Sequence, residues 1–159
     1  MYLNGNKVGR KRVEDFVALF KVKYKSGTLK AVALDSNKRE ISESKLSSGK
    51  KVTLKVQTDK TKLKTGELAF IHIKFVDENG NIVPYVEQQV DLQLIGESAY
   101  LQGFGSAQVK TDETYNNPYH NSFRGSCLAA VRAGTIKGQT RILIKTKNHI
   151  TQEIMMEVE

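Results

Sequence analysis

Alternation of apolar and polar residues runs through most of this 159-residue sequence and restricts its fold more than any other feature. Successive side chains of a β-strand point to opposite faces of a sheet, so an alternating segment is typical of a strand with one buried face. Val52, Leu54 and Val56, for example, are separated by Thr53 and Lys55. No segment of a dozen residues keeps a helical period. An all-β fold is therefore expected.

The strand candidates recur roughly every ten residues with Gly and Asn turns between them, which is typical of β-sandwiches. Asn4-Gly5 predicts a tight type I′ hairpin because both residues tolerate positive φ. The almost continuously apolar segment 68–76 predicts a central strand, and 77–81 is the strongest turn signal. Further strands are expected over 17–24, 28–34, 40–44, 52–57, 90–94, 99–102, 123–133, 139–146 and 154–158. Of these, 123–133 and 139–146 are expected to pair with each other.

The segment Leu46–Lys50 is small and polar and is the best candidate for a linker. The charge balance changes there: residues 1–49 carry 11 Lys and Arg against 5 Asp and Glu, whereas residues 50–159 carry 14 against 12. We therefore expect two immunoglobulin-like β-sandwiches in tandem, at 1–48 and 49–159.

A net charge of +8 raises the possibility of a nucleic-acid partner. Lys21, Lys23 and Lys25 nevertheless alternate with Val22 and Tyr24, which is typical of the solvated face of a strand. No helix-turn-helix, zinc-finger or aromatic RNA-binding signature accompanies the charge. No apolar run reaches the 18 or so residues of a membrane span, and the amino terminus does not resemble a signal peptide. Neither nucleic acid nor membrane is expected as a partner.

Metal sites, disulfides and cofactors are not expected. The single cysteine, Cys127, lies in an apolar strand candidate and is expected to pack in the core rather than react. The three histidines lie far apart and none has a second ligand at metal spacing. We expect His72 to be partly buried on a strand and His149 to lie in a turn.

Catalytic groups are also not expected. Glycoside hydrolysis needs two carboxylates that flank the scissile bond. The candidate pairs are Asp77-Glu78 and Asp112-Glu113, which are adjacent residues in turns or loops and are expected to be solvated. No Ser-His-Asp arrangement and no phosphate-binding loop is present.

Residues 111–123 form a polar segment too long for a routine connection. It brings Tyr115, Tyr119 and His120 together with several Asn residues. Aromatic faces and amide donors are what a sugar-binding surface uses, so these three residues are candidate ligand contacts. The alternative is an ordered loop that packs on its own sandwich or on a neighbouring domain.

Five segments, taken in order, resemble the carboxy-terminal tail of bacterial family 2 glycoside hydrolases, the β-galactosidase group. Residues 2–10 (YLNGNKVGR) resemble that tail's "LFLNGKSLG" hairpin, and 24–33 are similar to "Y-x-P-G-T-L-x-A-V-A", with Ser26 in the place of Pro. Residues 68–84 resemble "L-A-F-V-T-V-E-V-V-D-x-x-G-x-x-V-P" in an invasin-like immunoglobulin module at the end of the same enzymes. Residues 103–107 and 123–132 resemble two further segments of that module.

The resemblance implies a parent enzyme that cleaves β-galactosides or related β-glycosides with a Glu pair on a (β/α)₈ barrel. Neither the barrel nor its glutamates is in this sequence, so no catalytic residue is carried over. The resemblance also implies that the first module is incomplete and has an unpaired sheet edge, which an oligomer contact can cover. A periplasmic or secreted bacterial parent is expected.

The leading hypothesis is therefore a non-catalytic accessory fragment that supports the barrel of the parent hydrolase or its quaternary contacts. The alternative is an independent carbohydrate-binding or adhesion module that uses the 111–123 loop. Nucleic-acid binding by the basic first module is the third hypothesis.

Overall fold

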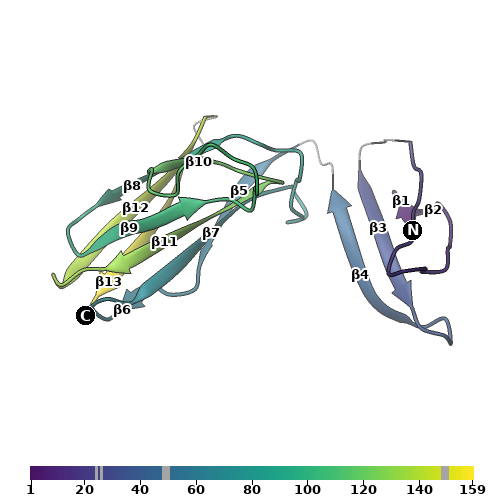
Figure 1. Cartoon of the computed structure of the whole chain (residues 1–159), viewed down its shortest axis with the longest axis horizontal. Coiled ribbons are helices and arrows are strands. Elements are labelled where there is room, and N and C mark those ends of the chain that lie inside the picture. The colour runs from purple at the N-terminus through teal and green to yellow at the C-terminus, as the bar shows by residue number, and fades with distance from the viewer. Residues whose placement is uncertain (24, 26, 48–50, 148–150) are drawn as a thin grey trace.

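The computed structural model describes residues 1–23, 25, 27–47, 51–147 and 151–159, and every regular element in them is a β-strand. One sheet is built from β1 (Tyr2–Leu3), β2 (Asn6–Lys7), β3 (Thr28–Leu34) and β4 (Glu40–Ser47). Two further sheets are built from β5 (Thr53–Thr58), β6 (Lys62–Leu63), β7 (Leu68–Val76), β8 (Gln89–Ile95), β9 (Ala99–Gly105), β10 (Tyr119–Asn121), β11 (Ser126–Ala133), β12 (Gly138–Thr146) and β13 (Thr151–Val158). The predicted all-β fold is confirmed (Figure 1). The described residues contain no helix able to span a membrane.

The first sheet has the strand order β2-β1-β3-β4. Asn4 and Gly5 both have positive φ, 51° and 80°, so the predicted hairpin turn between β1 and β2 is confirmed. The Asn4 side-chain oxygen accepts a hydrogen bond of 2.7 Å from the Thr28 amide and so fastens the hairpin to β3.

The strand predicted over 17–24 is wrong for the residues that the structure describes. Only Val17 makes a β-bridge, to Glu14, and residues 18–23 belong to no strand. Asp15 and Phe16 have φ values of 47° and 64°, which turn the chain just before the segment. Apolar and polar residues alternate in this segment, but a strand also needs a neighbouring strand for its backbone hydrogen bonds. The described part of the chain places no such strand beside residues 18–23.

This first part of the protein has no buried core. None of the side chains described in residues 1–46 is buried. Phe16, for example, is 102% exposed, and six other large apolar side chains of this part are exposed: Val8, Val13, Val17, Leu19, Ile41 and Leu46. A sheet normally packs one face against a second layer, and the described residues supply no such layer for this sheet.

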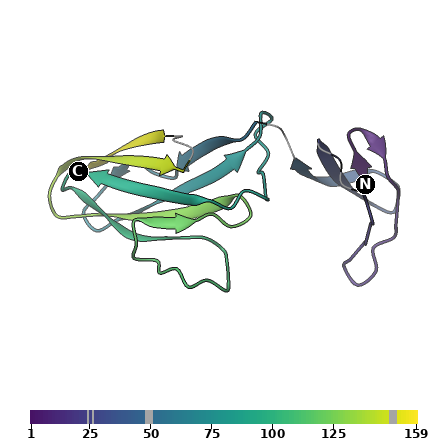
Figure 2. The same cartoon turned by 90° about the horizontal axis from the view of Figure 1, so that it is seen from above.

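Residues 51–147 and 151–159 form a β-sandwich of two sheets (Figure 2). One sheet has the order β5-β7-β11-β9 and the other β10-β8-β12-β13-β6. Every second residue of the central strands is buried in the core between the sheets. Ile71, Ile73 and Phe75 of β7 and Ile142 and Ile144 of β12 belong to this core. The prediction that 68–76 is a central strand is confirmed because β7 lies between β5 and β11.

The predicted pairing of 123–133 with 139–146 is wrong. β11 pairs with β7 and β9, whereas β12 pairs with β8 and β13 in the other sheet. Residues 134–137 therefore cross from one layer to the other, and both strands keep their apolar faces on the shared core. The short strands β6 and β10 were not predicted. β6 has two residues and pairs in parallel with β13, a contact distant in sequence.

Two predicted connections fall largely outside the described residues. Leu46 and Ser47 are the last residues of β4 rather than part of a linker, and residues 48–50 are not described. The predicted turn at Asn148-His149 is also not described. The division of the chain into modules 1–48 and 49–159 remains a prediction.

Candidate functional site

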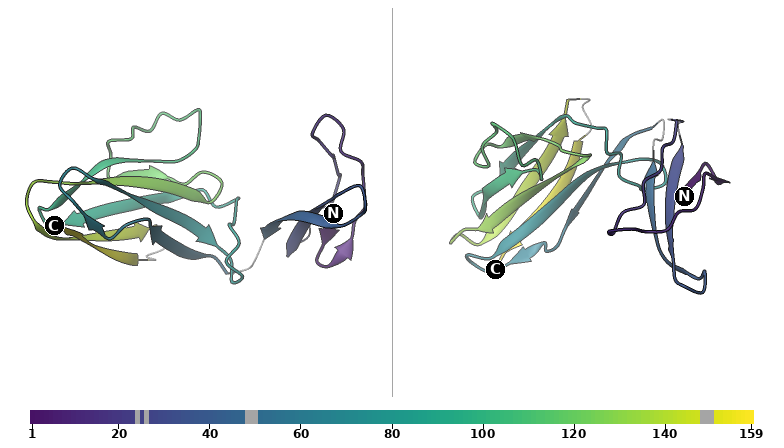
Figure 3. Two further views of the ribbon diagram at one scale, coloured as in Figure 1. Left: turned by 90° about the horizontal axis from the view of Figure 1, so that it is seen from below. Right: turned by 45° about the vertical axis from the view of Figure 1, so that its right-hand side comes forward.

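Residues 106–118 connect β9 to β10 and form a long loop that departs from the sandwich and returns to it (Figures 2 and 3). The polar segment expected over 111–123 is this loop together with β10. β10 adds to the edge of its sheet beside β8, where His120 is opposite Val90. The loop is thus closed by a strand, which gives its last residues fixed positions.

His120 is fully buried, with 0% of its surface exposed. Its Nδ1 lies 2.9 Å from the carbonyl oxygen of Asn121 and 3.2 Å from Oε2 of Glu113. Its Nε2 is buried and has no hydrogen-bond partner among the described residues. His120 therefore lies beneath the surface of the loop, and its predicted ligand contact stays a prediction.

Tyr115 lies on this buried histidine. The two rings are stacked, with centroids 6.0 Å apart and planes at 10°. On the sheet side the Tyr115 ring covers Gly105, where a Cβ atom would lie 2.4 Å from two ring carbons. The Tyr115 carbonyl also accepts a hydrogen bond of 2.7 Å from the Phe104 amide. The ring is 55% exposed, so it is held firmly while presenting part of its surface to solvent.

Tyr119 is 45% exposed but does not belong to the same surface. It precedes His120 on β10, and adjacent residues of a strand point to opposite faces. The structure therefore brings Tyr115 and His120 together, while Tyr119 lies on the other side of the strand. The ligand-binding role of these three residues remains a prediction.

Glu113 fastens the base of the loop. Its Oε1 accepts hydrogen bonds from the Asn121 amide at 3.0 Å and from the Asn121 side-chain nitrogen at 2.8 Å. Its Oε2 is the atom that faces His120. One carboxylate thus joins the loop to two residues of β10.

A groove of about 510 Å³ lies beside the Tyr115 ring on the outer face of the β5-β7-β11-β9 sheet. Sequence reasoning missed it because its walls come from three strands and the loop. Side chains that point outward from β7 and β11 contribute His72, Lys74, Ser126 and Leu128, and β9 contributes Gly103 and Gly105. His72 is exposed here, so the expectation that it is partly buried is corrected.

One member of each candidate carboxylate pair is used structurally. Asp77 is 2% exposed rather than solvated. Its Oδ1 accepts the amides of Asn79 and Asn81 at 3.0 and 2.9 Å and so holds the turn between β7 and β8. Glu113 is held in the contacts described above. In the residues that the structure describes, no three His, Cys, Asp or Glu side chains are grouped as metal ligands would be.

Cys127 is buried in the sandwich core, as expected from its apolar neighbours. Burial raises the pKa of its thiol to about 12. The thiolate, which is the reactive form, is therefore scarce at neutral pH.

Two family patterns match the sequence. Residues 53–155 match the family described as glycoside hydrolase family 2 C-terminal domain 5. Residues 1–42 match a family described as a domain of unknown function (DUF4982).

Individual relatives agree with these matches. The β-galactosidase BoGH2A of Bacteroides ovatus is 23% identical over 98% of this chain, which corresponds to 18% of that enzyme. The structure of a glycosyl hydrolase family 2 member from Bacteroides cellulosilyticus has a TM-score of 0.82 at 25% identity, over 99% of this chain and 21% of that one. A β-glycosidase from Bacteroides vulgatus has the same fold, with a TM-score of 0.81 at 21% identity over 99% of this chain and 20% of its own.

The chain thus spans about a fifth of each of these relatives. Its own folded sandwich is the part that carries the longer family match. The chain belongs to the glycoside hydrolase family 2 C-terminal domain 5 family and is a C-terminal module of a family 2 glycoside hydrolase.

Proposed function

We propose that this chain is a non-catalytic accessory fragment of a β-galactosidase-like glycoside hydrolase and that it supports the catalytic barrel or the quaternary contacts of its parent. The relatives that support this proposal are much longer than this chain and include an enzyme described as a β-galactosidase. In such a protein the chemistry belongs to the larger part, and the module supplies packing surface.

The missing core of the first sheet carries the proposal. Phe16, Leu19 and Ile41 are large and apolar, yet all are exposed in this chain. Burial of one such side chain contributes about 1.5–3 kcal/mol, so a surface that covers several of them stabilises the sheet substantially. A sheet with no second layer has little stability of its own. The larger part of the parent enzyme can supply the surface that covers this sheet.

The chemistry of the sandwich supports a non-catalytic role. A glycosidase holds two carboxyl groups about 5–10 Å apart and free to reach the substrate. Asp77 is committed to two turn amides, and Glu113 to Asn121 and His120. We accordingly expect the chain to show no hydrolysis of nitrophenyl β-galactoside.

Hydrogen exchange tests the accessory role directly. Amides of residues 28–47 are to be followed in the 159-residue chain alone and in the full-length parent. We expect fast exchange in the isolated chain and at least about tenfold slower exchange in the parent, because a covering surface suppresses local opening. Amides of β7 and β11 serve as the control, since they lie in a complete sandwich and should be protected in both proteins. Equal protection of residues 28–47 in the two proteins would contradict the proposal.

A second candidate function, carbohydrate binding by the 111–123 loop, is favoured by one observation. The exposed Tyr115 ring borders a groove of about 510 Å³, within the size range of small-ligand sites. This function does not exclude the first, because an accessory module can both pack on a barrel and hold a sugar.

A further inference from the structure

We infer that the groove beside Tyr115 binds a saccharide that carries a carboxylate, and that Lys74 is the residue that receives the acid group. The inference rests on the carbohydrate-binding function proposed above as the second candidate. It adds the position of the site on the sheet and the charge of the ligand.

Small residues form part of the floor of the groove. Gly103 and Ala130 are paired across β9 and β11, and Gly105 is paired with the larger Leu128 two residues along. Tyr115 covers Gly105 and forms the wall next to this part of the floor. A pyranose ring has a flat apolar face, and the exposed aromatic ring of Tyr115 provides a contact for it.

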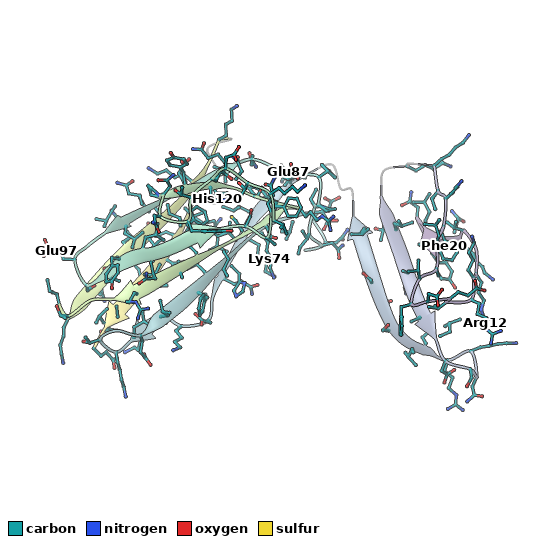
Figure 4. The ribbon with its side chains drawn as sticks, in the orientation of Figure 1. Arg12, Phe20, Lys74, Glu87, Glu97 and His120 are labelled. Atoms are coloured by element: carbon teal, nitrogen blue, oxygen red, sulfur yellow. The ribbon has the colours of Figure 1, made fainter. Side chains whose placement is uncertain are left out.

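The charge at the other end of the groove is positive and unbalanced. Lys74 of β7 lies directly opposite Lys55 of β5 in the sheet, and Figure 4 labels Lys74 on its strand. Like charges directly opposite each other on neighbouring strands are destabilising. Within the described residues neither lysine has an ion pair. A bound anion would remove the repulsion between them.

None of the described residues that line the groove is Asp or Glu. Glu113, in the loop that carries Tyr115, accepts hydrogen bonds from Asn121 and faces His120. The lining of the groove therefore brings no negative charge to Lys74. A ligand that brings its own negative charge fits this arrangement better than a neutral one.

The dimensions of the site favour a small ligand over a protein surface. Stable protein interfaces bury at least about 1,200 Å² in total, whereas small-molecule sites are concave and span about 300–1,000 Å³. The volume of the groove, about 510 Å³, lies in the range of small-molecule sites. One or two sugar units would occupy it, with the carboxylate at Lys74 and the ring against Tyr115.

Calorimetric titration of the 159-residue chain with glucuronic acid, galacturonic acid, glucose and galactose tests this inference. We expect the two uronic acids to bind at millimolar concentration and at least about fivefold more tightly than the neutral sugars, a difference near 1 kcal/mol. Raising the salt concentration from about 50 to 200 mM should weaken only the binding of the acids, because salt screens the charge of Lys74.

Matched variants locate the site. Lys74→Gln should remove the preference for the acids, and Tyr115→Leu, which keeps the bulk but loses the aromatic face, should weaken all binding by about tenfold. Lys145→Gln on β12, outside the groove, is the control and should change nothing. Circular dichroism melting of each variant identifies any loss of affinity that comes from unfolding.

Three outcomes would overturn the inference, and they differ in what they imply. Equal affinity for acidic and neutral sugars, both lost in Tyr115→Leu, would remove the acid preference but keep the carbohydrate-binding function. Binding of a hexaglutamate peptide without binding of either uronic acid would show that the groove holds acidic protein. No binding of any probe up to about 50 mM, far weaker than the millimolar range in which weak ligands are measured, would remove both the inference and the carbohydrate function.

Discussion

At the scale of single residues, the candidate site depends on a glycine. Gly105 and Gly103 lie two apart on β9, and both face the groove. A Cβ on Gly105 would lie 2.4 Å from the Tyr115 ring, whereas one on Gly103 would have its nearest contact at 3.7 Å, the Tyr115 carbonyl oxygen. The ring can lie flat on the sheet only because position 105 has no side chain.

Gly105→Ala should therefore displace the Tyr115 ring and destabilise the protein by about 1–3 kcal/mol, the usual cost of inserting atoms into a packed site. Urea unfolding measures this effect. Gly103→Ala is the matched control and should be close to neutral. Similar losses in the two variants would show that the ring does not rest on Gly105.

The second residue-scale prediction concerns Cys127, whose pKa burial raises to about 12. Iodoacetamide should alkylate this thiol very slowly at pH 8, because thiolate is rare there and access requires opening of the core. The rate should rise steeply in denaturing urea. Mass spectrometry follows the reaction, and rapid labelling of the folded chain would contradict the buried position.

At the scale of elements, Glu113 holds the 106–118 loop to β10. Glu113→Ala removes the carboxylate oxygen that accepts both hydrogen bonds from Asn121. The Asn121 amide should then exchange faster and the loop should be cut more quickly by protease, since local opening becomes easier. Asp112→Ala is the control, because Asp112 is its exposed neighbour in the loop. Unchanged exchange in Glu113→Ala would contradict this role.

A surface ion cluster joins β6 to the end of β13. Lys62 Nζ lies 2.9 Å from Glu159 and 3.2 Å from Glu157, and its hydrogen bond lowers the pKa of Glu159 below the usual 4.5. A carboxyl whose pKa is lowered by folding stabilises the folded state above its unfolded pKa and loses this contribution as the pH falls through its folded value. The stabilisation should therefore be complete at neutral pH and fade below about pH 4.5.

Lys62→Ala should raise the pKa of Glu159 toward its ordinary value, because Lys62 is the largest cause of its lowering. Nuclear magnetic resonance titration of the side-chain carboxyl carbon measures it. Lys55→Ala, on an edge strand of the other sheet, should leave that pKa unchanged. The effect on stability should be small because the groups are exposed.

At the scale of the whole molecule, the sandwich is expected to fold without the first sheet. Its core is formed by residues 54–158, and all described side chains of residues 1–46 lie outside it. A chain of residues 51–159 should therefore melt within a few degrees of the full chain, because little buried surface is lost. Melting measured by circular dichroism tests this, and a large drop would show that the first sheet stabilises the sandwich.

The sequence by itself determined most of the longer strands and several of the turns between them. Alternation and turn residues act on neighbouring positions, so β3, β5, β7, β8 and β12 could be placed from local pattern. The buried position of Cys127 and the hairpin at Asn4-Gly5 could also be predicted from neighbouring residues in the sequence. The family was identified by residues that keep their order along the chain.

Only the tertiary structure decided which strands lie side by side. The alternation in β11 and β12 is compatible with two arrangements: the strands can pair in one sheet, or they can lie in two sheets that face each other across the core. In the structure β11 pairs with β7 and β12 pairs with β8, so the two strands lie in different sheets. Segment 17–24 had the strand pattern but found no neighbour among the described residues. The groove likewise unites Lys74, Gly103, Tyr115 and Leu128, because sheet pairing and loop closure join positions that are far apart in sequence and carry no local signal of their proximity.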